Sequence, residues 1–81
     1  MDADHDNLQL DCRGMKCPRP IVEIAKLRRR ESGPVLVRVT GDDLAFESDV
    51  RAWCEVTGNA LKNLSSDQGN VVATIEFGAR A

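Results

Sequence analysis

The spacing of hydrophobic residues divides this chain into six short segments. Apolar and polar residues that alternate, or a run of β-branched residues, predict a strand, whereas apolar residues at every third or fourth position predict a helix. Strands are expected at residues 8–11, 35–40, 60–66 and 71–77, and helices from Pro18 to the Ser32-Gly33-Pro34 stop and over about 47–57. Each segment has an apolar face, so we expect all six to pack together.

The order of the segments, β-α-β-α-β-β, predicts the fold class. Two helices with one apolar stripe each bury both stripes when they pack on one face of a sheet. We therefore expect an α/β fold, a two-layer α/β sandwich with a four-stranded mixed sheet and two helices on one face. A ferredoxin-like order needs a hairpin before the second helix, whereas the turn sequence Asp67-Gln68-Gly69-Asn70 places the hairpin after it.

The apolar stripes of the helices also predict the core. They contain Ile21, Ile24 and Ala25, flanked by Leu27, in the first helix, and Phe46, Val50, Trp53, Cys54 and Thr57 in the second. Arg28 falls within the first stripe, so its stem is expected to pack while its charged head reaches solvent. Ser48 or Glu47 is expected to cap the start of the second helix, and Gly58-Asn59 its end.

Composition limits the size and the location of the protein. The 81 residues are 42% hydrophobic and 30% charged, as in an ordinary single domain. We place that domain at residues 8–77, between a flexible acidic tail (1–7) and a frayed end (78–81). So short a chain leaves no volume for a deep cavity, and a site is expected at the surface.

Neither a signal peptide nor an apolar run of about 18–20 residues is visible, which predicts a cytoplasmic protein without a membrane partner. An odd number of cysteines, three, argues against a disulfide framework and for a reducing compartment.

Charge is distributed unevenly along the chain. Residues 1–12 carry −4, residues 13–30 carry +6 and residues 31–81 carry −4, so one basic segment lies in an otherwise acidic protein. Such a segment either attracts an anionic ligand or an acidic protein surface, or forms a solvated helix face. Direct contact with nucleic acid is the third-ranked interpretation, because the net charge is −2 and aromatic residues do not alternate with the basic ones.

Cys17 is the candidate for chemistry. It directly precedes Pro18, so we expect it to be the N-cap of the first helix, where the helix dipole and unpaired N–H groups stabilise a thiolate. Arg13, Lys16 and Arg19 add positive potential nearby, which lowers a thiol pKa further. A thiolate is the form of cysteine that attacks another sulfur.

The other two cysteines have different expected roles. Cys54 lies on the apolar stripe beside Trp53 and is expected in the core. Cys12 precedes Cys17 by five residues and is either a packing residue or a resolving thiol, with packing favoured. A metal site made of the cysteines and His5 matches no standard zinc spacing, so no metal is expected. Asp42 and Asp43 are interpreted as turn residues that bind backbone N–H groups.

The segment Leu10-Asp11-Cys12-Arg13-Gly14-Met15-Lys16-Cys17-Pro18-Arg19-Pro20 resembles the signature of the TusA/SirA-like sulfur-carrier family. A second segment, Asp49 to Asn59, resembles the second helix of that family and its glycine stop. The resemblance covers residues 8–77, although Leu44 stands where family members often have proline. It implies a fold similar to the C-terminal domain of bacterial translation initiation factor three.

The resemblance also implies a function. Cys17 would accept sulfane sulfur as a persulfide, usually from a cysteine desulfurase, and pass it to an acceptor protein in a pathway such as tRNA thiolation, molybdenum-cofactor maturation or sulfur oxidation. Gly14, Pro18, Arg19 and Pro20 would support the motif, and Arg13, Lys16 and Arg19 would tune the thiolate or contact partners. The expected activity is that of a sulfurtransferase, with no cofactor beyond the covalent sulfur and a monomeric chain. The alternative is a thiol redox protein or sensor that uses Cys12 and Cys17.

Overall fold

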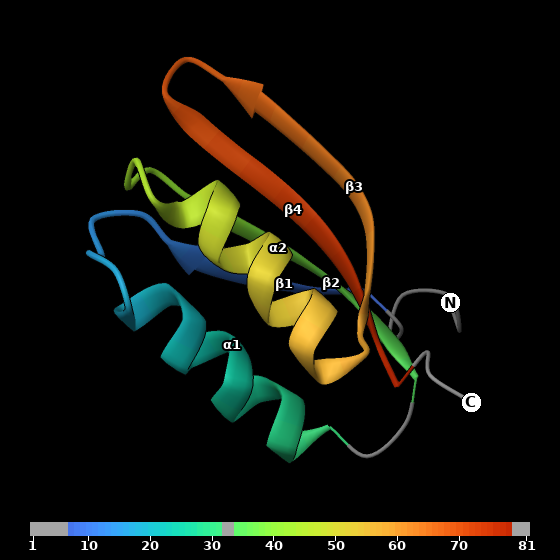
Figure 1. The fold of residues 1–81 in the computed structure, drawn as a ribbon. Helices are drawn as coiled ribbons and strands as arrows, with labels where there is room; N and C mark the ends of the chain where they lie inside the picture. The colour runs from blue at the N-terminus through green and yellow to red at the C-terminus, as the bar shows by residue number, and fades with distance from the viewer. Residues whose placement is uncertain (1–6, 32–33, 79–81) are drawn as a thin grey trace.

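A computed structural model describes residues 7–31 and 34–78 of the chain. In this part of the chain the elements follow the predicted order (Figure 1). Their bounds are β1 Asn7–Cys12, α1 Arg19–Arg30, β2 Val35–Gly41, α2 Phe46–Thr57, β3 Ala60–Asp67 and β4 Asn70–Phe77. The expected tail and frayed end lie outside the described residues, except for Asn7, which begins β1, and Gly78.

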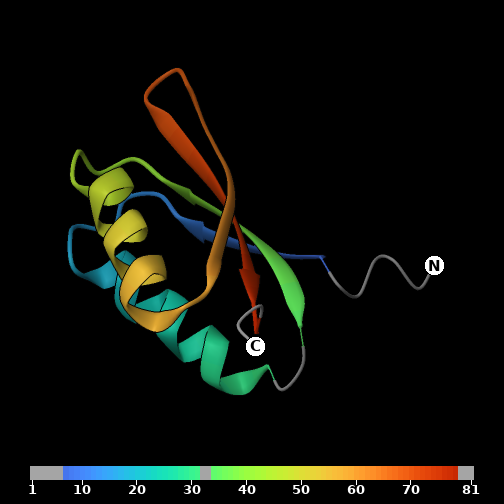
Figure 2. The ribbon, with the colours of Figure 1, turned by 45° about the vertical axis from the view of Figure 1, so that its right-hand side comes forward.

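The strands form a mixed sheet in the order β1-β2-β4-β3. β1 runs parallel to β2, and β4 runs antiparallel to both β2 and β3. The parallel pair needs a crossover connection, which α1 supplies, and the two-residue turn Gln68-Gly69 joins β3 to β4. Both helices cover the same face of the sheet (Figures 1 and 2). The predicted two-layer architecture is therefore confirmed.

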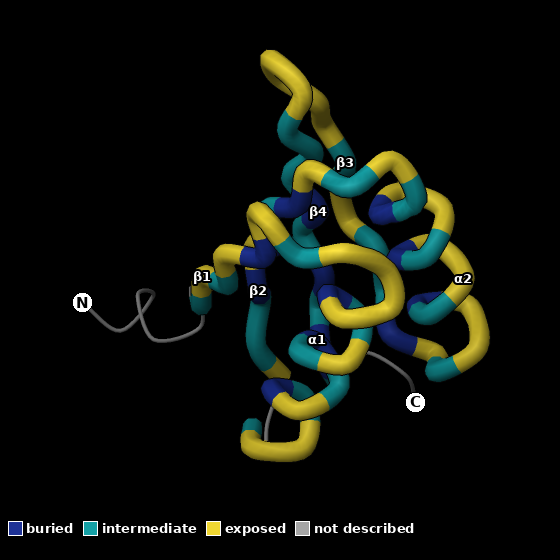
Figure 3. Tube along the Cα trace, turned by 90° about the vertical axis from the view of Figure 1, so that its left-hand side faces the viewer, coloured by how far each residue is buried: buried dark blue, intermediate teal, exposed yellow. Residues whose placement is uncertain are grey.

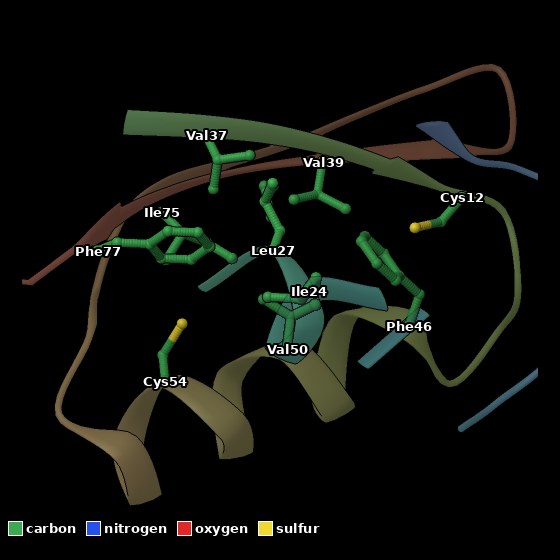
Figure 4. Packing of buried hydrophobic residues seen from close by; sticks show 11 residues of the cluster. Cys12, Ile24, Leu27, Val37, Val39, Phe46, Val50, Cys54, Ile75 and Phe77 are labelled. Atoms are coloured by element: carbon green, nitrogen blue, oxygen red, sulfur yellow. The ribbon is translucent and has the colours of Figure 1, made fainter. Parts of the chain in front are cut away.

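The core lies between the helices and the sheet (Figure 4). Figure 3 shows that exposed positions follow the outer side of both helices. Every second residue is buried from Val37 to Gly41 on β2 and from Ala73 to Phe77 on β4, as expected of strands with one covered face. The buried hydrophobic residues are Cys12, Ile24, Leu27, Val37, Val39, Phe46, Val50, Cys54, Ala73, Ile75 and Phe77.

The buried line of α1 differs slightly from the prediction. Pro20, Ile24 and Leu27 are buried at positions i, i+4 and i+7, whereas Ile21 and Ala25 are half-buried. The helix is thus turned so that Leu27, expected only to flank the stripe, faces the sheet. This rotation leaves Ile21 beside α2, where it becomes part of the surface described below.

The predicted C-cap of α2 is confirmed, whereas the predicted N-cap is wrong. Its N-cap is Ala45, not Ser48 or Glu47, because the helix begins at Phe46, whose side chain is anchored in the core. Ser48 instead donates a hydrogen bond from its hydroxyl to the Ala45 carbonyl, 3.3 Å away. At the other end, Gly58 takes the left-handed conformation expected of a C-cap. Neither helix in the described residues is long and apolar enough to span a bilayer.

Aromatic side chains anchor both ends of the helix layer. At one end the backbone of Gly41 passes over the ring of Phe46, where an added Cβ would lie 2.7 Å from the ring carbons. At the other end Trp53 and Phe77 meet edge to face, with ring centroids 6.1 Å apart. The guanidinium of Arg28 lies 5.9 Å from the centre of the Phe77 ring, so its charged head contacts the ring, whereas the sequence predicted packing of the stem alone.

Candidate functional site: an exposed thiol beside an apolar hollow

Of the three cysteines, only Cys17 is exposed. It lies in the loop between β1 and α1, which the structure fixes at several points. Gly14 has a positive φ of 83°, and the N–H of Met15 donates to the carbonyl of Cys12 over 3.2 Å, so the chain turns sharply after β1. The turn at Gly14 is followed by Cys17, which lies at the surface near the start of α1.

A contact with the next loop holds the Cys17 loop in place. The N–H of Gly14 donates to Oδ1 of Asp42, 3.0 Å away and 28 residues further along the chain. Asp43, the next residue, accepts the N–H of Ala45 through Oδ2 over 3.1 Å. Both aspartates therefore bind backbone N–H groups, as expected of turn residues. The hydrogen bond between Gly14 and Asp42 thus ties the loop that carries Cys17 to the loop before α2.

The thiol of Cys17 has an acidic partner. Its Sγ donates a hydrogen bond to Oδ2 of Asp49, 2.6 Å away, from the first turns of α2. This hydrogen bond, together with partial desolvation and the negative charges of Asp49 and Asp43, raises the pKa of Cys17 above its usual value. The expectation of a lowered thiol pKa is therefore wrong for the isolated protein.

The position of the start of α1 also explains why the helix terminus does not lower the pKa of Cys17. α1 begins at Arg19, and Pro18 rather than Cys17 is its N-cap. Of the first amides of the helix, the N–H of Arg19 already donates to the Lys16 carbonyl over 2.8 Å, and Pro20 has none. These two positions therefore offer no free N–H group that could stabilise a thiolate at Cys17.

Arg13 does not tune the thiol directly. Its guanidinium binds Asp11 through two hydrogen bonds of 2.9 Å each, and this contact lowers the pKa of Asp11 to about 2. Lys16 and Arg19, the other expected tuning residues, flank Cys17 along the chain and are exposed. They stay available for contact with a partner, as the sequence suggested, whereas the largest causes of the shift in the thiol pKa are the hydrogen bond to Asp49 and desolvation.

The rest of the basic segment is partly engaged within the chain. Lys26 forms an ion pair with Glu23, 3.6 Å away, and Arg28 packs on Phe77. Arg29 and Arg30 are exposed at the far end of α1 from Cys17. The +6 segment of the sequence is thus divided between both ends of the helix.

Beside Cys17 lies a shallow apolar hollow of about 360 Å³ between α1 and α2. Its lining residues are Cys17, Pro18, Ile21, Asp49, Ala52, Trp53 and Val56. Val56 is 84% exposed and contributes an accessible aliphatic side chain to this surface. The arrangement presents a thiol and one carboxylate in a surface that is otherwise apolar.

The sequence reasoning missed Asp49. The available signal was its spacing on the second helix, because Asp49, Ala52 and Val56 follow one another at i, i+3 and i+7 and thus share a face. That face adjoins the buried stripe but does not belong to it. Only the packing of α1 against α2 shows that Cys17 lies against it.

The two remaining cysteines are packing residues. Cys12 is fully buried, and desolvation, followed by the charges of Glu23 and Asp11, raises its pKa to about 11. Burial likewise raises the pKa of Cys54. Both side chains are thus buried in the core, as expected of packing residues. His5, the remaining member of the metal set weighed above, lies outside the described residues.

Comparison with known proteins gives a consistent result. The family model described as "Sulfurtransferase TusA" matches residues 8–76. A protein of Aquifex aeolicus named "Putative sulfur carrier protein" is 32% identical over the whole of this chain, which spans 41% of that relative's length. A protein of Neisseria meningitidis with the same description is 38% identical over 61 residues, 74% of this chain and 81% of the relative.

A solved structure shares the fold. The SirA-like protein of Desulfitobacterium hafniense superimposes with a TM-score of 0.77 at 24% identity, over 88% of this chain and 97% of the other. Its order of elements agrees with the two-layer sandwich seen here. Because the family model covers nearly the entire folded part, the chain belongs to the TusA sulfurtransferase family of sulfur carriers.

Proposed function

We propose that this chain carries sulfane sulfur as a persulfide on Cys17 and passes it to an acceptor protein. The observation that carries the proposal is the position of Cys17, which is the exposed cysteine and borders an apolar hollow, while Cys12 and Cys54 are buried. Transfer between two proteins requires that their sulfur atoms meet, which favours a thiol on an open surface over one in an enclosed pocket. Membership of the sulfur-carrier family supports the same function.

The loading step is an exchange at sulfur. Sγ of Cys17 attacks the outer sulfur of a donor persulfide, a new S–S bond forms, and the S–S bond of the donor breaks. The donor sulfur leaves with the electron pair as a thiolate, and the proton of Cys17 ends on that thiolate or in solvent. In delivery, an acceptor thiolate attacks the same outer sulfur, and Cys17 leaves as a thiolate and regains a proton. The sulfane sulfur keeps its oxidation state throughout, so neither step needs an oxidant.

The partners follow from this chemistry. The donor is a protein that makes a persulfide, such as a cysteine desulfurase, and the acceptor is a protein with a reactive thiol. The apolar hollow suits a partner segment that is itself apolar around its sulfur, because both surfaces then leave water together. No cofactor beyond the covalent sulfur is required.

Mass spectrometry tests the proposal. The chain, incubated with a cysteine desulfurase and cysteine, is expected to gain about 32 Da, which a reductant removes. Peptide mapping under non-reducing conditions should place the added sulfur on Cys17. A mass gain on Cys12 or Cys54, or none with any persulfide donor, contradicts the proposal.

The same mass spectra also test the alternative function, that of a thiol redox protein. A protein that works through a Cys12–Cys17 disulfide becomes about 2 Da lighter on oxidation and needs both residues. The structure does not favour this alternative, because Cys12 is buried in the core and Cys17 is hydrogen-bonded to Asp49.

Docking at the hollow can be tested at Val56. Val56→Asp places a charge in the apolar contact, and burying an unpaired polar group costs roughly 1–3 kcal/mol. Since about 1.4 kcal/mol corresponds to a factor of ten in affinity, we expect the apparent KM for the donor to rise roughly tenfold or more. The nearly isosteric Val56→Thr is the matched control. Equal loading kinetics of wild type and Val56→Asp would show that partners dock elsewhere.

A further inference from the structure

We propose that Asp49 holds Cys17 in its resting thiol form and accepts the thiol proton when Cys17 attacks the sulfane sulfur of a donor. This inference rests on the proposed function of Cys17 and assigns its neighbour a part in the same reaction. It begins from the contact itself: the thiol donates to Oδ2 of Asp49 over 2.6 Å, so donor and acceptor already meet along the path that the proton would take.

Asp49 lies in largely apolar surroundings, in direct contact with the Cys17 sulfur. Asp49 is half-buried, and the hollow that it borders is otherwise lined by apolar groups such as Pro18, Trp53 and Val56. Asp43, from the loop before α2, also raises the thiol pKa, and its Oδ2 accepts the N–H of Ala45. Lys16 and Arg19 flank Cys17 in sequence. Asp49 is therefore the carboxylate in direct contact with the sulfur.

In the free protein, water solvates the carboxylate and the proton stays on sulfur. A thiol in this form reacts slowly with small electrophiles and oxidants, because the thiolate is the nucleophile. A partner that covers the hollow removes this water, and desolvation penalises a compact carboxylate more than a large, polarisable sulfur anion. Docking thus favours movement of the proton from Sγ to Oδ2.

The proton balance of the loading step is then complete. The Sγ–H bond breaks and an O–H bond forms at Asp49, while Sγ bonds to the outer sulfur of the donor and the donor sulfur leaves as a thiolate. The departing thiolate or solvent afterwards removes the proton from Asp49. The arrangement makes Cys17 selective, since it is activated only by a partner that fits the hollow.

The test compares two reactions of Asp49→Asn. Alkylation of Cys17 by iodoacetamide in the free protein should become faster at pH 7, and its pH profile should move to lower pH. For each pH unit of that move the thiolate fraction rises tenfold while its nucleophilicity falls about threefold, so alkylation accelerates by about threefold. Loading by the persulfide donor at the same pH should instead slow by tenfold or more, because the proton acceptor is missing.

Control variants separate this role from general charge or folding effects. Glu47→Gln removes a negative charge from the same turn of α2, where Glu47 contacts Arg51 rather than Cys17, and should leave both rates unchanged. Asp49→Glu, which keeps a carboxylate, should recover part of the loading rate. Unchanged urea midpoints would show that each variant is folded.

Each remaining result contradicts the inference. Unchanged alkylation in Asp49→Asn means that Asp49 does not control the thiol, and acceleration of both reactions means that it suppresses the thiolate without accepting the proton. If wild type gains no sulfur from any donor, the proposed function fails. The alkylation profile still decides in that case whether Asp49 sets the resting form of Cys17.

Discussion

Replacing Cys17 by serine should abolish the gain of sulfane sulfur completely. A serine hydroxyl has nearly the same shape, yet it is not ionised at neutral pH and does not exchange at sulfur. The substitution at an exposed position should leave the fold intact, so that the loss reports chemistry alone. The measurement is the intact mass after incubation with a cysteine desulfurase and cysteine, together with the rate of sulfur delivery to an acceptor thiol.

Variants of the buried cysteines are the controls for this result. Cys54→Ala and Cys12→Ala keep small apolar side chains in the core and should load sulfur as the wild type does, with modestly lower stability. Persistence of the 32 Da gain in Cys17→Ser, or its loss in Cys12→Ala while the protein remains folded, would refute Cys17 as the carrier residue.

Phe46→Ala should be the most destabilising substitution in the helix layer. Phe46 is 1% exposed and lies against the backbone of Gly41, so truncation of its ring leaves a cavity that the close-packed strand cannot fill. Removal of a buried Phe side chain costs about 3–5 kcal/mol. A domain of this length has a total stability of about 4–12 kcal/mol. We therefore expect a large fall in the urea midpoint, with partial unfolding at 37 °C.

The control for this prediction lies on the same helix. Val56→Ala removes an exposed aliphatic side chain and should change the free energy of unfolding by less than about 0.5 kcal/mol. If Phe46→Ala does not fold, Phe46→Leu gives a measurable intermediate because it retains most of the apolar volume. Equal midpoints for Phe46→Leu and wild type would mean that the ring is not needed at the Gly41 contact.

The elements of the fold were largely predictable because their signals are local. Alternation on β2 and β4, the proline-led start of α1 and the Gly58 stop of α2 depend on neighbouring residues, and the structure confirms them. The cap of α2 was predicted wrongly for a reason that is not local. Phe46 is drawn into the core under Gly41, so the helix begins before the polar residues that would have capped it.

At the site, too, some features follow from local sequence and others depend on tertiary packing. The exposed Cys17 and the packing roles of Cys12 and Cys54 follow from the motif and from the apolar pattern, both of which lie in short stretches of sequence. The lowered thiol pKa was inferred from the same stretch and is wrong. A pKa responds to every charge and dipole nearby in space, and the group in contact with Cys17 comes from 32 residues away.

The sequence by itself determined the order of the elements, the buried face of α2 and, approximately, that of α1, because backbone preferences and apolar periodicity are properties of adjacent residues. Only the tertiary structure decided that Asp49 meets Cys17 and that Ile21, Trp53 and Val56 surround them. The packing of α1 against α2 sets these distances, and no spacing within either helix contains that information. The resting state of the thiol therefore belongs to the fold rather than to the motif.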